Sequence, residues 1–316
     1  MSIKFSIFLP TGFAMEYMGF PDPAAAYERM TEITRAADEA GFETAWVADH
    51  FTPAVPGVPA GVFESWVTLA GLARDTQRIR LGHMVNGNSY RHPSLLAKMA
   101  STLDVSSNGR FTLGLGGGWL ESDYAYGFTL GTPGERLAAL REAAQIVKSM
   151  WADEATTFDG KYYQVNGAVN LPKGVQSPQI PLLIAGGGEK VTLKIAAEFA
   201  DGCNIIESPE VLRHKFEVVK QHCKNVGREY AEILRTTCSY AAITETDAEA
   251  AAAIPPWAPS VFPGNAADYL LVGTVDTIRE RIAAYEDAGV QELAITFGQA
   301  VEDPSVLHTF AKAFID

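Results

Sequence analysis

The dipeptide Asp49-His50 ends an apolar run over residues 44–48 that is typical of a buried strand. A histidine exchanges protons near neutral pH, and an adjacent carboxylate can orient its ring or raise its pKa. The pair can therefore donate and accept a proton beside a bound substrate. A structural interpretation is equally open, in which both side chains hold the end of the strand through hydrogen bonds.

Two glycine-rich segments also follow apolar runs. Gly116-Gly117-Gly118 precedes Trp119, so a ligand can approach the backbone beside a flat aromatic face. Ala185-Gly186-Gly187-Gly188 leads into a predicted helix over residues 189–199, and glycine N–H groups at a helix start can hold an anion. Three adjacent glycines are conformationally costly for a simple turn, so we favour a phosphate site. Neither segment matches a dinucleotide or P-loop fingerprint.

A third segment, residues 82–93, contains Asn86-Gly87-Asn88 followed by Arg91-His92. Asn and Gly tolerate positive φ, so an unusual backbone is expected there. Without further context, the segment is best interpreted as a tight turn with a solvated basic edge.

Other chemistries find little support in the sequence. The six histidines are scattered without metal-ligand spacing, so no metal site is expected, and no serine-hydrolase elbow occurs. The net charge is −13, from 25 Lys+Arg against 38 Asp+Glu. This excess argues against nucleic acid or an anionic membrane as partner. It does not exclude a phosphate-bearing cofactor held by backbone N–H groups.

These segments need a scaffold that brings several strand ends together. Amphipathic stretches separate eight strand-like runs, over residues 3–10, 44–48, 79–85, 110–115, 181–185, 202–206, 234–243 and 292–297. This alternation favours an α/β fold in which residues 1–316 form one (β/α)₈ TIM barrel, with insertion loops over its C-terminal face. A doubly wound open sheet is the rival architecture. A polar hairpin is expected over residues 156–169, turning at Asp159-Gly160.

One insertion and the cysteines bear on function and location. Residues 248–273 are rich in Ala and Pro, and would form either a lid over the active face or a plain surface connection. Cys203, Cys223 and Cys238 form no C-x-x-C pair and are expected to be reduced core thiols. We find no signal-peptide pattern and no apolar run near the ~20 residues of a membrane span, so a cytoplasmic protein is expected.

In their order along the chain, these segments resemble the bacterial-luciferase-like family of flavin- and F420-dependent oxidoreductases, over essentially the whole sequence. No single stretch is specific, but the ordered set is. The matching stretches are Gly41-Phe42-Glu43, Trp46-Val47-Ala48-Asp49-His50, Ile79-Arg80-Leu81-Gly82-His83-Met84-Val85, Arg91-His92-Pro93, Gly109-Arg110-Phe111, Leu113-Gly114-Leu115-Gly116-Gly117-Gly118-Trp119, Pro133-Gly134-Glu135-Arg136, Ala185-Gly186-Gly187-Gly188, Val272-Gly273-Thr274 and Val290-Gln291-Glu292.

The subgroup most similar to this chain uses coenzyme F420, a deazaflavin that carries hydride at C5, whereas other members use FMN and oxygen. The resemblance implies that His50 is the acid/base and that Met84-Val85 is a non-prolyl cis peptide backing the cofactor ring. It further implies a ring-to-tail channel along Gly117, Gly118 and Trp119, and a phosphate site at Gly186 to Gly188. The complete set of implied cofactor-binding residues is Asp49, Met84, Val85, Asn86, Gly117, Gly118, Trp119, Ala185, Gly186, Gly187 and Gly188.

The sequence also departs from its relatives. The sugar-phosphate-oxidising F420 enzymes have a carboxylate where Trp119 stands here, and we identify no basic phosphate pocket for a substrate. Both departures argue against a phosphorylated sugar as substrate. Position 83 is small in many relatives but is His83 here, and the sequence suggests no role for it.

The leading hypothesis is an oxidoreductase that transfers hydride between F420 and a small organic substrate. An FMN-dependent monooxygenase served by a separate flavin reductase is the first alternative. A non-catalytic flavin-binding protein is the second. The resemblance also implies a homodimer.

Overall fold

The computed structural model describes residues 3–20, 22–55 and 57–315. Within those residues, eight parallel strands close into a barrel, each hydrogen-bonded to the next, and the last pairs with the first through Lys4 and Glu292. The strands are β1 (Lys4–Phe8), β2 (Thr44–Val47), β3 (Arg80–His83), β5 (Phe111–Gly116), β8 (Leu182–Ala185), β9 (Gly202–Asn204), β10 (Leu234–Ile243) and β12 (Glu292–Thr296). The predicted TIM barrel is therefore confirmed, and the open sheet is wrong.

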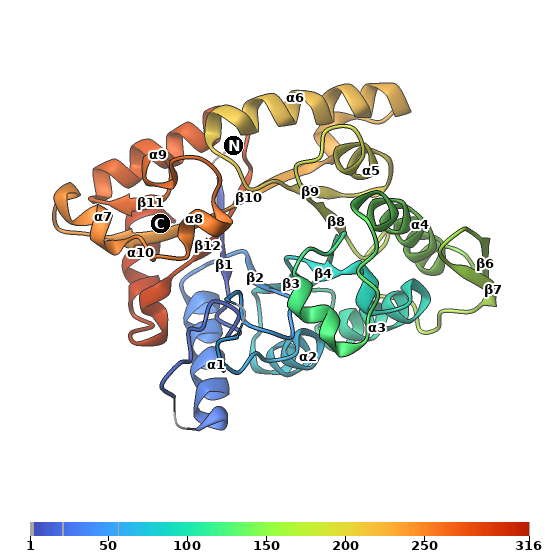
Figure 1. Ribbon diagram of the computed structural model, residues 1–316, viewed down its shortest axis with the longest axis horizontal. Coiled ribbons are helices and arrows are strands. Elements are labelled where there is room, and N and C mark those ends of the chain that lie inside the picture. Colours follow the sequence, from blue (N-terminus) through green and yellow to red (C-terminus); the bar gives the residue numbers. More distant parts are fainter. Residues whose placement is uncertain (1–2, 21, 56, 316) are drawn as a thin grey trace.

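Helices surround the barrel, as Figure 1 shows. They are α1 (Pro23–Glu39), α2 (Ser65–Asp75), α3 (Pro93–Ser106), α4 (Pro133–Ala152), α5 (Thr192–Phe199), α6 (Pro209–Val226), α9 (Val275–Asp287) and α10 (Val306–Phe314). Proline occupies the first turn of α1, α3, α4 and α6, where its missing N–H is harmless. Among the helices of the described ranges, none is both long and apolar enough to cross a membrane.

The structure corrects several predicted boundaries. Helix α5 starts at Thr192 and not at residue 189, because residues 189–191 form a turn after the glycines. The third strand ends at His83, and residues 86–87 form a separate short strand, β4 (Asn86–Gly87), paired with β5. Helix α9 and the short strand β11 (Leu271–Gly273), which pairs with β10, were not predicted.

The predicted hairpin is present, but its turn is longer than expected. It pairs β6 (Thr156–Asp159) with β7 (Gln164–Ala168) in antiparallel fashion, and residues 160–163 connect them. The carboxylate of Glu142 on α4 accepts the backbone N–H groups of residues 161–163. This anchoring favours the four-residue connection over a two-residue Asp-Gly turn.

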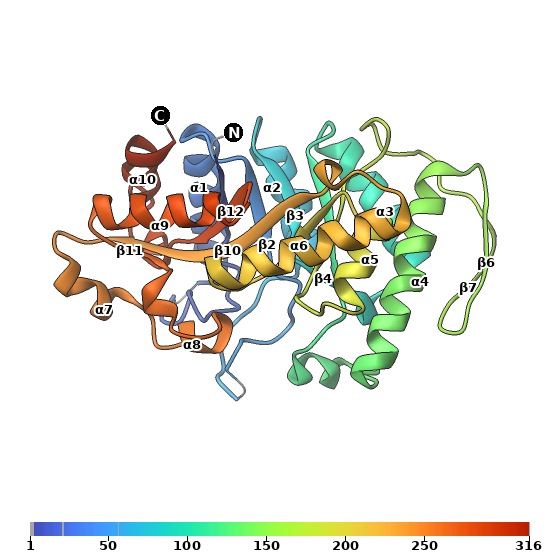
Figure 2. The same ribbon diagram turned by 90° about the horizontal axis from the view of Figure 1, so that it is seen from above.

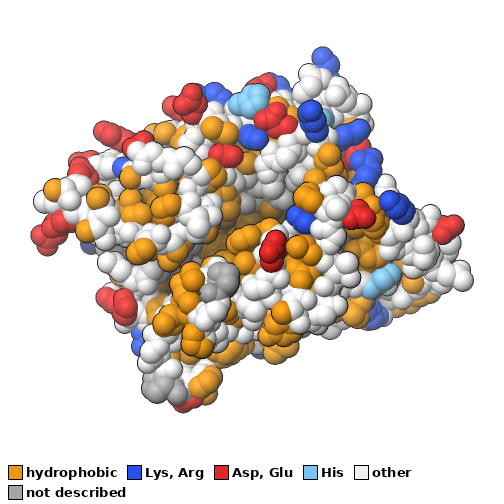
Figure 3. Space-filling view, viewed as in Figure 1, with side chains coloured by type: hydrophobic (Ala, Val, Ile, Leu, Met, Phe, Trp, Pro, Cys, Tyr) orange, Lys and Arg blue, Asp and Glu red, His pale blue; other side chains and the backbone are white. Residues whose placement is uncertain are grey.

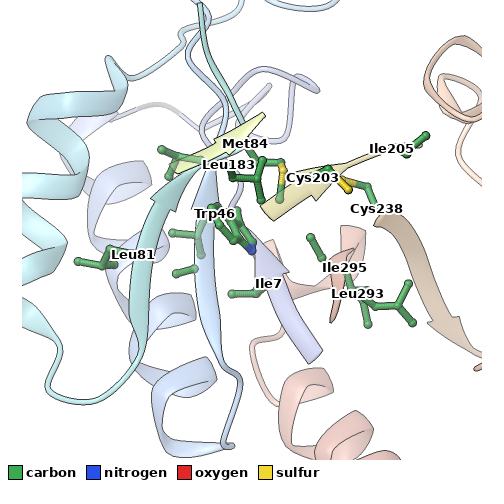
Figure 4. Close-up of a cluster of buried hydrophobic side chains, with 14 of the residues drawn as sticks. Ile7, Trp46, Leu81, Met84, Leu183, Cys203, Ile205, Cys238, Leu293 and Ile295 are labelled. Carbon is green, nitrogen blue, oxygen red and sulfur yellow. The ribbon is translucent and has the colours of Figure 1, made fainter. Parts of the chain in front are cut away.

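The barrel interior is filled by side chains from many strands, which Figure 4 shows around the indole of Trp46. Gly82 leaves room for that indole, since a Cβ there would lie 2.4 Å from it. The indole N–H donates to the Oε1 atom of Glu292 at 3.1 Å, and the hydroxyl of Ser6 donates to the same atom at 2.5 Å. Burial raises the pKa of the Glu292 carboxyl. These hydrogen bonds link β1 and β2 to β12.

The three cysteines are buried and unpaired, which confirms the prediction of core thiols. Burial raises the pKa of Cys203 and Cys238 to about 12. Because the thiolate is the reactive form, burial lowers the reactivity of these two thiols at neutral pH.

Candidate active site

A cavity of about 520 Å³ opens at the C-terminal ends of the barrel strands. Its walls come from the loops after β1, β2, β3, β5 and β8, together with residues 257–262. Figure 3 shows the hollow in this face, with hydrophobic side chains gathered beside it. In barrels of this type, the loops at this end of the strands carry ligand binding and catalysis.

The fold brings most of the residues singled out in the sequence to this one cavity. The lining includes His50, Asp49, Met84, Val85, Asn86, Gly117, Gly118, Trp119, Ala185, Gly186 and Gly187. Gly188 does not line it. Its carbonyl accepts the N–H of Leu193, and a Cβ at Gly188 would lie 2.9 Å from the hydroxyl of Thr192. The peptide bond between Met84 and Val85 is cis, as the resemblance implied.

His50 is held by a carboxylate that the sequence did not reveal. Its Nδ1 lies 2.7 Å from Oδ2 of Asp123, which belongs to the short helix η2 (Glu121–Tyr126) after β5. The imidazole stacks on Phe13 at 4.2 Å between ring centroids, and the indole of Trp119 meets it edge-on. Only 13% of the His50 side chain is exposed, so the ring is fixed in the cavity wall.

The hydrogen-bond donors around Asp123 keep its carboxylate ionised. Its side chain is fully buried, which opposes ionisation, but hydrogen bonds from His50 and from the N–H of Phe51 outweigh burial and lower its pKa. Oδ1 also accepts the N–H and hydroxyl of Thr52, and Oδ2 accepts the hydroxyl of Tyr90. A carboxylate only accepts hydrogen bonds, so the proton between the two residues resides on Nδ1 of His50. The other ring nitrogen, Nε2, is then the atom that can exchange a proton.

Asp49 does not orient His50, so that part of the sequence interpretation is wrong. Adjacent residues of an extended chain point to opposite sides. The buried carboxylate of Asp49 instead accepts from Arg91 at 2.7 Å, from the Ser65 hydroxyl at 2.7 Å and from the Gly87 N–H at 3.0 Å. Arg91 is largely buried and is therefore not part of a solvated basic edge.

His83 extends this buried cluster behind the cavity. Its Nε2 lies 3.2 Å from the hydroxyl of Ser65, and burial lowers its pKa well below the ordinary value, so the ring is neutral. The Ser65 proton is directed to Asp49, which requires His83 to donate from Nε2. The cluster thus holds the strand end that carries Asp49 against the segment that carries Gly87.

The loop after β8 combines glycine backbone with a cation. Gly186 adopts φ of +127°, which strains any other residue. The ammonium of Lys215, on α6, donates to the carbonyl of Gly187 at 2.8 Å and lies 3.2 Å from Glu189. A Cβ at Gly187 would lie no closer than 3.6 Å to any neighbour, so there is space beside this backbone. Sequence analysis missed Lys215 because it lies 28 residues further along the chain.

A second carboxyl group, Glu16, lines the cavity from the loop after β1. Its Oε2 atom is buried and has no hydrogen-bond partner in the described ranges. Burial raises the pKa of Glu16 to about 7. The sequence offered no signal for this residue, because an isolated glutamate in a loop is usually solvated.

The Ala/Pro-rich insertion lies over the cavity. It contains the short helices α7 (Ala250–Ala253) and α8 (Ala258–Val261), and Trp257, Val261 and Phe262 contribute apolar surface to the cavity wall. The Trp257 ring packs edge-on against Tyr240 at 5.9 Å between centroids. Figure 2, seen from above, shows α7 and α8 near each other on one side of the barrel. The insertion is therefore part of the site wall, and the lid interpretation stays a prediction.

The residues present fit a flavin-type cofactor, which combines a flat ring with a phosphate-bearing tail. The cavity offers apolar surface from Met84 and Val85, together with the glycine backbone of residues 186–187. The Lys215 ammonium lies behind that loop, on the carbonyl of Gly187. Within the described residues, no group of three or more His, Cys, Asp or Glu side chains is placed to hold a metal ion.

Comparison with known proteins places this geometry in context. The family model described as luciferase-like monooxygenase matches residues 3–292. An F420-dependent glucose-6-phosphate dehydrogenase of Kineococcus radiotolerans is 33% identical over 175 residues, 55% of this chain and 51% of that protein. The enzyme of the same name from Gordonia bronchialis is 30% identical over 227 residues, 69% and 66% of the two chains. The matches thus span half to two thirds of these relatives.

Solved structures show the same fold at low sequence identity. An F420-dependent secondary alcohol dehydrogenase in complex with an F420-acetone adduct superimposes with a TM-score of 0.83 at 17% identity, covering 100% of both chains. The oxygenating constituent of 3,6-diketocamphane monooxygenase from Pseudomonas putida, in complex with FMN, gives a TM-score of 0.77 at 17% identity, covering 99% of this chain and 97% of that one.

Proposed function

The chain belongs to the luciferase-like monooxygenase family, and from this premise we propose that it is an oxidoreductase transferring hydride between coenzyme F420 and a small organic substrate. The relatives with the names quoted above support F420 over other cofactors. Bound F420 supplies the ring carbon C5 that gives or takes the hydride. The chain's own residues bind, orient and exchange the accompanying proton.

The observation that carries the proposal is the pairing of His50 with Asp123 in the cavity wall. The buried carboxylate fixes the proton on Nδ1, so Nε2 of His50 can accept a proton and return it. Stacking on Phe13 prevents the ring from rotating away. A simple binding protein does not need such an oriented histidine, which argues against the non-catalytic alternative.

Cofactor placement follows from two parts of the cavity wall. We propose that Met84, Val85 and Asn86 back the ring, with Asp49 holding their segment in place through the N–H of Gly87. Gly117, Gly118 and Trp119 line the passage toward the tail. Gly187, with Lys215, holds its phosphate through an N–H group and a positive charge, whereas Gly186, whose N–H donates to the carbonyl of Asn204 at 3.0 Å, shapes the loop. Gly188 acts indirectly, by shaping the turn.

The test is a parallel titration of the apo protein with F420 and with FMN, followed by intrinsic tryptophan fluorescence. Trp119 and Trp257 line the cavity and report on its occupancy. Saturation at micromolar F420 but not FMN is expected, and absorbance of the deazaflavin then measures turnover. Failure to bind F420 would refute the assignment.

The second candidate is an FMN-dependent monooxygenase that receives reduced flavin from a separate reductase. Its support is the FMN complex that shares this fold, together with an apolar insertion able to restrict water. Tighter binding of FMN than of F420, with flavin-dependent oxygen consumption, is the outcome that favours it.

Assembly and location are also proposals. We propose a homodimer, because α2 and α3 expose large apolar side chains such as Val67 and Leu95. Sedimentation equilibrium tests this, and a Val67→Glu variant should be monomeric. We propose the cytoplasm as the compartment, where the three unpaired thiols stay reduced.

A further inference from the structure

The substrate-facing walls of the cavity are apolar. Phe13 comes from the loop after β1, Trp119 from the loop after β5, and Trp257, Val261 and Phe262 from the insertion. Trp119 is 59% exposed although it is a large aromatic residue, so contact with a ligand would remove apolar surface from water. An apolar molecular body is therefore favoured in this space.

Positive charge is scarce in the same space. Among the described residues that line the cavity, Arg136 is the only lysine or arginine, and its guanidinium donates to the carbonyl of Gly131 at 3.0 Å. Lys215 lies at the glycine loop, which the proposed cofactor tail occupies. A substrate phosphate needs several cationic or N–H donors to offset its lost hydration. Apart from Arg136, no cationic side chain among the described lining residues is placed to hold a second phosphate.

One polar atom in this apolar space has no partner. Oε2 of Glu16 is buried and unpaired, and an unsatisfied buried oxygen destabilises the free protein. A hydroxyl group on a bound molecule can donate to this atom and remove that cost. When Glu16 is ionised, an ether or methyl group in the same place would leave the atom unsatisfied, and a phosphate would repel the carboxylate.

We infer that the substrate is an uncharged, largely apolar molecule whose hydroxyl group donates to Glu16, and that phosphorylated sugars are excluded. The inference rests on the proposed hydride-transfer function and narrows its substrate class. It separates this chain from the glucose-6-phosphate dehydrogenases to which it is similar. Glu16 is thus a specificity-determining residue, distinct from the proton-exchanging His50.

The test uses three probes that share one apolar body: benzyl alcohol, benzyl methyl ether and benzyl phosphate. Calorimetry at about pH 9, where Glu16 is ionised, measures their dissociation constants. The protein is loaded with reduced F420, so that its phosphate site is filled and the cofactor cannot accept hydride from the alcohol. We expect the alcohol to bind about tenfold more tightly than the ether, because only the alcohol can donate a hydrogen bond to the buried Oε2 atom of Glu16. Benzyl phosphate should bind more weakly than both.

Variants of Glu16 test whether this residue causes the preference for the alcohol over the ether. Glu16→Leu should bind the alcohol and the ether equally, whereas Glu16→Gln retains an acceptor oxygen and should keep the preference. Glu28→Leu, at an exposed position on α1, is the matched control and should behave as the wild type. If Glu16→Leu does not fold, Glu16→Ala is measured instead and should likewise lose the preference for the alcohol over the ether.

Equal binding of alcohol and ether by the wild type, or tight binding of benzyl phosphate, would overturn the inference. So would a preserved preference in Glu16→Leu. Failure of the proposed function looks different, because the protein would then not bind F420. The alcohol and the ether would in that case be compared on the apo protein, where the same preference for the alcohol is expected.

Discussion

Nδ1 of His50 and Oδ2 of Asp123 lie 2.7 Å apart, although 73 residues separate them in the sequence. The contact joins the loop after β2 to the loop after β5, with β3 between these strands in the barrel. It therefore exists only once β2, β3 and β5 lie side by side in the sheet, and it gives the imidazole a fixed tautomer and direction.

We predict that His50→Gln lowers kcat by a factor on the order of a hundred to ten thousand, because a positioned acid/base is lost. Asp123→Asn should lower kcat about a hundredfold, since the ring loses its orientation. Steady-state kinetics with F420 measures both, once a substrate is known. The dissociation constant for F420 should stay within about twofold of the wild-type value in both variants, as should all parameters of the exposed control Asp276→Asn. Wild-type kcat in His50→Gln would remove the proposed acid/base.

The ion pair between Arg91 and Asp49 should contribute strongly to the free energy of unfolding. Asp49→Ala leaves Arg91 with Glu64 as its remaining ion-pair partner and leaves the buried Ser65 hydroxyl and Gly87 N–H without their acceptor, so the free energy of unfolding should fall by about 3–5 kcal/mol. Guanidinium chloride titration measures the change. The solvent-exposed pair between Arg35 and Asp75 provides the control, and Asp75→Ala should cost less than about 1 kcal/mol. Similar losses in the two variants would contradict the structural role of Asp49.

The pKa of Glu16 predicts a pH-dependent stability. Its pKa rises from 4.5 to about 7 on folding, so between these values the folded protein binds a proton that the unfolded chain releases. Stability must therefore fall as pH rises through this range. Glu16→Gln has no proton to release at this position. Its free energy of unfolding relative to the wild type should therefore rise by roughly 1–3 kcal/mol between about pH 5 and about pH 8. Thermal melts of both proteins at the two pH values test this prediction. The same difference in stability between variant and wild type at both pH values would refute it.

Lys215 should distinguish phosphate-bearing ligands from those without phosphate. Lys215→Met is expected to weaken F420 and FMN binding about tenfold, because a charge-assisted hydrogen bond is lost. Riboflavin, which lacks the phosphate, should bind Lys215→Met and wild type alike. Lys220→Met, on the exposed side of the same helix, is the matched control. Equal weakening of riboflavin would mean that Lys215 supports the fold and does not contact phosphate.

The sequence predicted the parts of the site that depend on strand ends. His50 and the Gly117 and Gly186 loops each follow a strand directly, so the period of the apolar residues is enough to place them on one face of a barrel. The partners of these residues could not be predicted in the same way. Asp123 reaches His50, and Lys215 reaches Gly187, only through the pairing of neighbouring strands and the packing of helices on them. Short elements also escaped prediction, because β11 has three residues and takes its stability from β10.

The link between Ser6 and Glu292 has a consequence for synthesis. These residues are 286 positions apart, and β1 completes its pairing only when β12 is available. A ribosome adding about 5–20 residues per second needs on the order of 15 to 60 seconds to cover that distance. Throughout that interval, the nascent chain carries an unpaired strand edge, the kind of surface that recruits other chains. The barrel's last strand therefore sets the period during which a chaperone is most useful to this protein.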